Sequence, residues 1–185
     1  MLNDVYADTK ERMTKALDSL ESDYKRLRTG RASVSLVDGI RVEYYGTPTP
    51  LAQLATLTVP EPRTIMIQPW DISVLGAVEK AILKSELGLT PMNDGKIIRI
   101  NIPTLTADRR KELVKLVKKI AEETKVAVRN IRRDANEMVK DFKKDKQISE
   151  DEQFKAQDET QKITDDFIKR IDALYAAKEK EILEI

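Results

Sequence analysis

Every glycine and every proline of this 185-residue chain lies between residues 30 and 103. The segments on either side, 3–28 and 106–145, contain neither residue, and their apolar side chains recur at steps of three and four. Glycine and proline are the residues that most destabilise a helix interior, and this spacing places apolar side chains on one helix face. Both segments are therefore predicted to be long helices. A third helix is predicted to begin at a capping box formed by Ser149 and Glu152.

The predicted helix over residues 106–145 has an apolar seam with one slip in its heptad-type repeat. The members of this seam are Leu113, Val117, Ile120, Thr124, Ala127, Ile131, Ala135, Met138 and Phe142. The positions predicted to face inward on the third helix include Phe154 near its start and Leu183 near its end. One amphipathic helix cannot bury such a seam alone. The three helices are therefore predicted to form an antiparallel bundle from residues 1–29 and 105–185.

The glycine- and proline-rich segment, residues 30–104, is predicted to be a small domain inserted between the first two helices of the bundle. Its β-type runs lie at residues 40–44, 55–59, 64–67 and 97–102. A short helix is predicted at 73–87, the prolines of 47–50 and 60–62 are interpreted as turns, and Trp70 as a core or interface anchor. The predicted fold class is therefore α+β with two domains, a long three-helix bundle and an inserted β/α/β domain.

Two backbone connections would join the insert to the bundle, near residues 29–31 and 103–106. Such a pair forms a hinge more readily than a broad interface does, although firm packing of the insert against the bundle is the alternative. The residues predicted at the hinge are Thr29, Gly30, Pro103, Thr104 and Leu105.

The chain contains no cysteine and no histidine, which excludes most catalytic chemistry. Disulfides, thiolate metal sites and histidine bases are impossible, and no phosphate-binding glycine motif occurs. No cofactor, metal or small-molecule substrate is therefore expected. A carboxylate-based hydrolase would need paired acids in a recognisable cleft, which the sequence does not offer. No apolar run could span a membrane and no secretory signal begins the chain, so a cytoplasmic, monomeric, non-enzymatic protein is expected.

Near-neutrality, with 33 basic and 32 acidic side chains, conceals two oppositely charged helices. Residues 106–145 hold 13 basic and 8 acidic side chains, net +5, whereas residues 147–185 hold 6 and 11, net −5. On a helical wheel the cations of the first segment gather around Arg129, opposite the apolar seam, and only Glu122 interrupts them. This basic stripe consists of Lys111, Lys115, Lys118, Lys125, Arg129, Arg132, Arg133, Lys140 and Lys143, with Asn136. It is predicted to face solvent along most of the helix.

The basic stripe has two interpretations. Charged helix faces usually keep a bundle soluble, but such faces mix signs so that pairs form at i,i+4. Here like charges repeat, and arginine, whose planar fork suits bidentate phosphate contact, occurs at 129, 132 and 133. A phosphate-backbone partner is favoured, in particular structured RNA, since the stripe lacks aromatics that would stack on unpaired bases. The alternative is a non-catalytic helical adaptor whose stripe binds an acidic partner.

Five blocks that follow one another along the chain carry a family resemblance. They are residues 28–33 (RTGRAS), 42–51 (VEYYGTPTPL), 77–82 (AVEKAI), 126–136 (VAVRNIRRDAN) and 145–151 (DKQISED). Together they closely resemble the bacterial ribosome recycling factor family, with Val34 standing where the family often has proline. The resemblance implies an L-shaped, tRNA-like molecule that acts after termination. With elongation factor G and GTP, such a protein splits the ribosome into subunits and releases it from mRNA.

The same resemblance implies where the molecule binds. The bundle would lie across large-subunit rRNA near the peptidyl-transferase region and the intersubunit bridge, and elongation factor G would push the insert. The positions implied to contact rRNA are Arg28, Arg31, Arg110, Arg129, Arg132 and Arg133, to which the stripe adds Lys125 and Asn136. Replacing Arg132 with glycine or alanine is expected to abolish ribosome splitting while the fold is kept.

Overall fold

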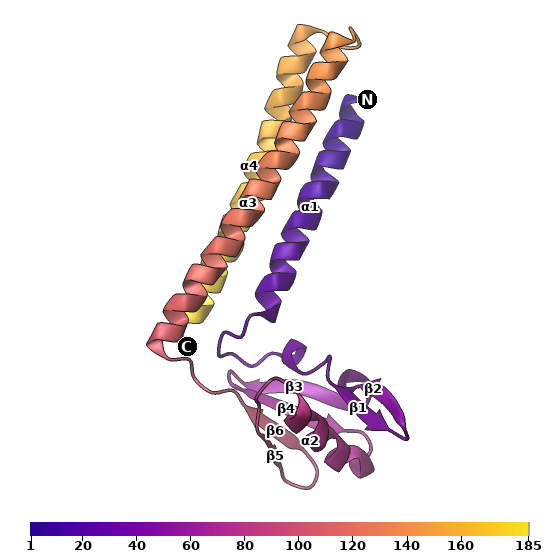
Figure 1. Ribbon diagram of the computed structural model, residues 1–185, viewed down its shortest axis with the longest axis vertical. Helices are drawn as coiled ribbons and strands as arrows, with labels where there is room; N and C mark the ends of the chain where they lie inside the picture. The colour runs from indigo at the N-terminus through magenta and orange to yellow at the C-terminus, as the bar shows by residue number, and fades with distance from the viewer. Residues whose placement is uncertain (185) are drawn as a thin grey trace. The chain divides into compact units, whose positions relative to one another are not determined.

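The computed structural model describes residues 1–184, which divide into two compact units. One unit comprises Met1–Leu27 and Asp108–Glu184, and the other comprises Arg28–Ala107. Figure 1 shows the first as a set of long helices and the second as strands with one short helix. Each unit has its own elements and contacts and is described by itself.

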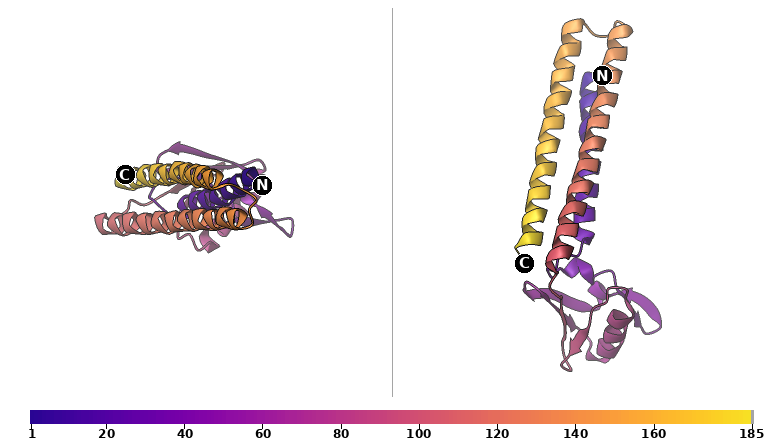
Figure 2. Two further views of the ribbon diagram at one scale, coloured as in Figure 1. Left: turned by 90° about the horizontal axis from the view of Figure 1, so that it is seen from above. Right: turned by 60° about the vertical axis from the view of Figure 1, so that its left-hand side comes forward.

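The helical unit consists of α1 (Leu2–Arg26), α3 (Ala107–Lys144) and α4 (Glu150–Leu183). The three helices run side by side in every view, and α4 returns antiparallel to α3 (Figures 1 and 2). Three long helices were predicted at nearly these bounds, and the α+β fold class is confirmed.

The corner between α3 and α4 is fixed by two capping motifs. Lys146 adopts a left-handed conformation with φ 57, and the N–H of Gln147 donates to the Phe142 carbonyl at 2.9 Å, which closes α3 in a Schellman motif. The Ser149 hydroxyl accepts from the Glu152 N–H at 3.2 Å, and the Glu152 carboxylate accepts from the Ser149 N–H at 2.7 Å. The predicted capping box is therefore present. The short corner makes α3 and α4 antiparallel neighbours along their whole length.

The buried face of α3 is rotated from the predicted seam. Its buried residues are Leu113, Val117, Ala121, Val128, Ile131, Ala135 and Val139. Ala127 and Met138 were predicted to be inward but are exposed, and their places are taken by Val128 and Val139, while Ile120 is only half-buried. The reason is that α3 packs against two helices, so its buried face turns toward the gap between them, whereas the prediction assumed one seam.

Two inward predictions for α4 are wrong. Phe154 is 58% exposed and Leu183 is 54% exposed. The buried residues of α4 include Ala156, Thr160, Ile163, Phe167 and Ile171, and at about 100° per residue Phe154 lies roughly 120° away from the centre of the face that they define. Leu183 is the last residue of its helix, where no further turn covers it.

Tyr24 ties the C-terminal end of α1 to the N-terminal third of α3. Its ring is buried, and its hydroxyl donates to the backbone carbonyl of Val117 on α3 at 2.9 Å. Burial, with a smaller contribution from nearby Tyr175 of α4, raises the pKa of Tyr24 to about 12. The hydroxyl therefore stays protonated and able to donate throughout the ordinary pH range.

The second unit contains a hairpin, a four-stranded sheet and the short helix α2 (Leu75–Lys84). The strands are β1 (Arg41–Tyr44), β2 (Thr47–Pro50), β3 (Ala55–Glu61), β4 (Thr64–Pro69), β5 (Pro91–Asn93) and β6 (Ile98–Asn101). Single turns of 3₁₀ helix lie at Val34–Leu36, Leu51–Gln53 and Ile72–Val74. The hairpin pairs β1 with β2, and the sheet has the antiparallel order β3-β4-β6-β5. Val78 and Ile82 of α2 pack with the buried isoleucines of β4 and β6 to form the core.

Three features of this unit differ from the sequence-based prediction. Residues 47–50 form strand β2 and Pro60 lies within β3, where turns were predicted. Strand β5 was not predicted. Trp70 is 68% exposed, and its indole N–H donates to the Thr56 hydroxyl at 2.9 Å, so it is not a core residue. The two-residue period of β4 explains this, because Ile65, Ile67 and Pro69 point into the core and Trp70 falls on the other side.

Candidate nucleic-acid interface

The cations of α3 form two rows that differ in their partners. The outer row is Lys111, Lys115, Lys118, Arg129, Arg133 and Lys140. All six side chains are exposed, and within residues 1–184 none of them takes part in an ion pair or a side-chain hydrogen bond. The inner row is Lys125, Arg132 and Lys143 with the neutral Asn136, and all four side chains contact α4.

Lys125 is paired with two carboxylates and is largely covered. Its ammonium lies 2.5 Å from the Asp172 carboxylate of α4 and 3.3 Å from that of Glu122, and its side chain is 15% exposed. The hydrogen bond to Asp172 is the main cause that raises the pKa of Lys125; burial acts against it and Glu122 adds to it. Lys125 therefore serves as an internal partner of two carboxylates, and its prediction as a solvent-facing residue is wrong.

The other inner-row residues also face α4. The guanidinium of Arg132 donates through Nη1 to the Gln161 side-chain carbonyl, and its buried Nε has no hydrogen-bond partner within residues 1–184. The Asn136 side-chain oxygen accepts from the Thr160 hydroxyl at 2.7 Å. Lys143 lies 3.4 Å from the Glu150 carboxylate. The predicted continuous solvent stripe is thus divided, because its flank nearest the buried face is covered by α4.

Four of the seven carboxylates of α3, those of Glu112, Glu122, Glu123 and Asp134, are paired with cations outside the outer row. Asp134, which interrupts the arginine run, lies 2.6 Å from the Arg12 guanidinium of α1. Glu112 pairs with Arg109 at 2.9 Å, and Glu123 with Lys119 at 3.9 Å. Exposed pairs of this kind contribute little stability. Their effect is on the charge distribution, since neither they nor the paired Glu122 neutralise the outer row.

The remaining predicted contacts divide between the two units. Arg110, on the first turn of α3, is half-buried, and its Nε has no hydrogen-bond partner within residues 1–184. Arg28 and Arg31 are exposed but belong to the unit Arg28–Ala107, so they are not part of the α3 surface. The cations of α3 therefore form one surface of the helical unit, and these two arginines belong to the other unit.

The α4 residues that hold the inner row, Thr160, Gln161 and Asp172, were not identified from the sequence. The sequence does contain a signal for these contacts. Each of the three residues and its partner on α3 are almost equally distant in sequence from the corner at residues 145–149. In an antiparallel pair with a short connection, residues equally distant from the corner face one another. Folding the sequence about residue 147 would have found these contacts.

The outer row has the properties of a surface for a polyanion. Lys111 and Lys140 are 29 residues apart, which corresponds to roughly 44 Å of helix. Arginine and lysine side chains spread over such a length can each contact a separate phosphate of a folded nucleic acid. No histidine, cysteine or acidic cluster within residues 1–184 could hold a metal ion, and no helix there is long and apolar enough to cross a membrane.

Comparison with known proteins places the chain in a family. The family model described as Ribosome recycling factor matches residues 20–183. The chain is 80% identical over 185 residues to the ribosome-recycling factor of Syntrophobacter fumaroxidans, with 100% of both chains covered. It is 63% identical over 184 residues to that of Desulfatibacillum aliphaticivorans, again with 100% of both covered.

Solved structures agree with this placement. A solution structure of a ribosome recycling factor matches with a TM-score of 0.79 and 46% identity, covering 100% of this chain and 98% of that one. A second match has a TM-score of 0.67 and 50% identity, with 99% of each chain covered. It comes from a structure of the T. thermophilus ribosome recycling factor and E. coli elongation factor G bound to the E. coli post-termination complex. The resemblance seen in the sequence is confirmed, and this chain belongs to the ribosome recycling factor family.

Proposed function

We propose that this protein disassembles the post-termination ribosome together with elongation factor G and GTP, splitting it into subunits and releasing it from mRNA. Family membership supports this role, as does the related structure that holds a recycling factor and elongation factor G on a post-termination complex. The protein would act in the cytoplasm as a monomer and would catalyse no reaction itself. GTP hydrolysis by elongation factor G would supply the energy.

The observation that carries the proposal is the outer row of α3. Its six exposed cations have no compensating partner within residues 1–184, so their charge is available to phosphates. We assign Arg129 and Arg133 as the principal contacts to large-subunit rRNA, near the intersubunit bridge and the peptidyl-transferase region. Arg28, Arg31 and Arg110 are further candidate contacts. Binding through phosphates positions the bundle on the RNA without reading its sequence.

The inner row has a different part in this proposal. Lys125, Arg132 and Asn136 hold α3 against α4 and so keep the outer row on a straight, rigid support. Loss of splitting in an Arg132 variant would therefore not separate RNA contact from bundle stability. Variants of Arg129 and Arg133 make the separation possible.

We further propose that residues 1–29 with 105–185 and residues 30–104 act as two domains joined by a hinge at Thr29, Gly30, Pro103, Thr104 and Leu105. Gly30 has φ 81, a left-handed conformation that glycine adopts without strain. Just inside the insert, the Ala32 N–H donates to the Pro62 carbonyl and the Ile102 N–H to the Arg63 carbonyl, each at 2.8 Å. Both connections are thus anchored at the same β3–β4 turn, an arrangement that allows the insert to rotate as one body.

Residual dipolar couplings measured separately for the two domains test the hinge. Alignment tensors that differ in magnitude between the domains are expected, because a hinged domain averages its orientation. A single tensor that fits both domains would contradict the hinge and favour firm packing.

Light scattering during ribosome splitting, with elongation factor G and GTP, tests the function. The double variant Arg129→Ala, Arg133→Ala is expected to lose splitting while its melting temperature stays unchanged. Arg170→Ala is the matched control, since Arg170 is an exposed arginine on α4 that pairs with Asp166 at 3.0 Å. Unimpaired splitting by the double variant would contradict the assigned contacts. If the unaltered protein split no ribosomes, the adaptor alternative would replace the proposal.

A further inference from the structure

The register of the β1–β2 hairpin determines which backbone N–H and C=O groups of β1 and β2 are not hydrogen-bonded within the hairpin. Tyr45 and Gly46 have φ values of 48 and 79 and form a two-residue turn of type I′. The residues that flank such a turn, Tyr44 and Thr47, form a hydrogen-bonded pair, and these pairs alternate along an antiparallel ladder. The Leu51 N–H donates to the Ile40 carbonyl at 2.8 Å, which continues the same alternation.

It follows that the two edges of the hairpin differ. The N–H and C=O groups of Arg41 and Glu43 point away from β2, and β2 is the only strand paired with β1 within residues 1–184. On β2, the residues opposite them are Pro50 and Pro48, which have no N–H to offer at the outer edge. The β2 edge is therefore closed to a further strand by its prolines, whereas the β1 edge is open.

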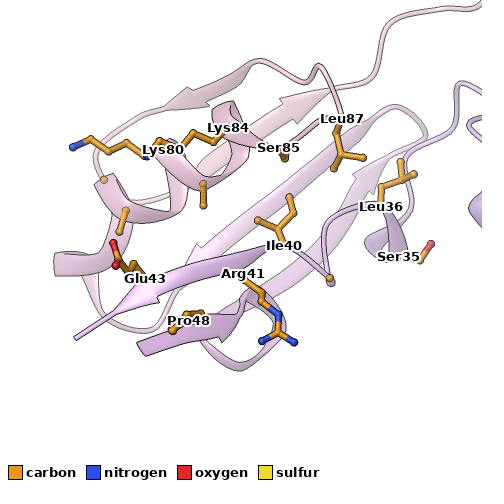
Figure 3. A pocket seen from close by; sticks show the side chains of 14 residues that line it. Ser35, Leu36, Ile40, Arg41, Glu43, Pro48, Lys80, Lys84, Ser85 and Leu87 are labelled. Carbon is orange, nitrogen blue, oxygen red and sulfur yellow. The ribbon is translucent and has the colours of Figure 1, made fainter. Parts of the chain in front are cut away.

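A groove lies along the open edge of β1. Its volume is about 1000 Å³, and it is lined by β1 and by the small residues Gly76, Ala77 and Ala81 of α2. Figure 3 shows Glu43 of β1, and Ile40 just before this strand, between Pro48 on one side and Lys80 and Lys84 of α2 on the other. The small side chains of α2 leave space for an added chain beside β1.

The groove is apolar within and positively charged at its rim. Leu36, Ile40 and Leu87 supply apolar surface. Arg41, Lys80 and Lys84 surround it with three cations against one carboxylate, that of Glu43, and none of the four takes part in an ion pair within residues 1–184. A neutral apolar strand would leave these cations uncompensated, and a basic one would be repelled.

We propose that the insert binds an extended acidic segment of a partner protein by adding it as a strand to β1. The backbone N–H and C=O groups of Arg41 and Glu43 would make four hydrogen bonds to the added strand. Alternate side chains of that strand would lie in the groove, and carboxylates would meet Lys80 and Lys84. This is the strand-addition mode of peptide recognition, in which the main chain provides affinity and the side chains provide specificity. A second copy of this chain fits less well, because its β1 would bring another arginine to a cationic rim.

Hydrogen exchange measured by NMR on the full-length ¹⁵N-labelled protein gives the sharpest test. The probe is a seven-residue peptide of alternating aspartate and valine. At saturating peptide, the Arg41 and Glu43 amides are expected to exchange at least about tenfold more slowly, because each gains a hydrogen bond. The Val42 and Tyr44 amides, already bonded to β2, are expected to keep their rates. Contact through charge alone would not produce this alternation.

Matched peptides and variants separate the contributions in a fluorescence anisotropy titration. N-methylation of alternate peptide amides keeps the charge but removes donors, and it is expected to weaken binding about tenfold. Glu43→Pro removes the free N–H without disturbing the ladder to β2, and it should weaken binding to a similar extent, as should the double reversal Lys80→Glu, Lys84→Glu. The double variant Arg129→Ala, Arg133→Ala should bind the peptide as the unaltered protein does, which excludes the outer row of α3 as its site.

Three results would overturn the proposal. The first is equal affinity for the N-methylated peptide, which would show a contact through charge without strand addition. The second is no change in exchange at Arg41 and Glu43 at millimolar peptide. The third is a slowing of these two amides with protein concentration in the absence of peptide, which would identify a second copy as the occupant.

Discussion

The two rows of cations on α3 are made of the same residue types on the same helix, yet they do different things. Inner-row side chains find carboxylate, amide or hydroxyl groups on α4, whereas outer-row side chains find none within residues 1–184. The difference shows that the residue type alone does not determine whether a basic side chain on a helix stabilises the fold or remains free to bind a partner. What it does is decided by the group that the neighbouring helix places opposite it. The predictions below test whether the two rows separate stability from binding as cleanly as the contacts indicate.

The largest effect is expected from two adjacent residues of α3, one of which is buried and the other exposed. Val128 is fully buried, so Val128→Asp places an unpaired carboxylate in the core and should destabilise the bundle by about 3–5 kcal/mol. Arg129→Asp should change the unfolding free energy by less than about 0.5 kcal/mol while weakening ribosome binding at least about tenfold. Urea denaturation and ribosome co-sedimentation measure the two quantities. A similar loss of stability in both variants would remove the distinction between the faces.

Next in size is the coupling between Arg132 and Gln161. A double-mutant cycle with alanine at both positions should give an interaction energy of about 1 kcal/mol, as expected for a hydrogen bond between helices. The matched cycle of Arg129 with Gln161 should give less than about 0.3 kcal/mol. Thermal denaturation provides the free energies. Equal coupling in the two cycles would mean that the inner row is not defined by its contacts with α4.

The pH dependence of stability should reveal Lys125. Its pKa is raised in the folded protein, chiefly by the hydrogen bond to Asp172, from the ordinary value of 10.5. The stabilisation is thus fully present below the unfolded pKa and is lost as pH rises through the folded pKa. The difference in melting temperature between the unaltered protein and Lys125→Met should therefore shrink above about pH 10.5. Lys118→Met, which removes an unpaired outer-row side chain, should differ little from the unaltered protein at every pH. A constant difference for Lys125→Met would show that the pair does not stabilise the fold.

The smallest predicted effect is on the salt dependence of ribosome binding. Lys118→Ala should reduce the slope of log affinity against log salt concentration by about one, because one phosphate contact releases about one counterion. Lys125→Ala should leave that slope unchanged, since its ammonium is already neutralised by two carboxylates. Affinities measured at several salt concentrations decide this. Equal slopes for Lys118→Ala and the unaltered protein would remove Lys118 from the contact surface.

Features of the fold that depend on neighbouring residues in the sequence could be predicted, whereas features that depend on contacts between helices could not. The restriction of glycine and proline to residues 30–103, together with the helical and β-type spacings of apolar residues, predicted the fold class. The Ser149–Glu152 spacing predicted the capping box. All these patterns depend on local backbone physics. The sequence of α3 alone could not show that Val128, and not Ala127, belongs to the buried face. That choice depends on where α1 and α4 lie, and a single helix carries no record of its neighbours.

The candidate site shows the same limit. The helical wheel grouped the cations of α3 into one stripe, but it could not separate Arg129 from Arg132, because the separation is made by Gln161 of another helix. Strand β2 was missed for a related reason. Proline predicts a turn unless the strand register is known. Only the pairing with β1 shows that Pro48 and Pro50 occupy positions whose N–H would not bond to β1.

The prolines of β2 also set a limit on self-association. A hairpin with two open edges is a bifunctional unit, because another strand can pair with either edge. Each added copy then offers a new open edge, and a sheet can grow without limit. Here one edge accepts hydrogen bonds and donates them, and the other offers carbonyl groups alone at Pro48 and Pro50. Such a unit is monofunctional. Two copies joined through their open edges would present only closed ones, so growth through this hairpin ends at a pair instead of continuing into a fibre.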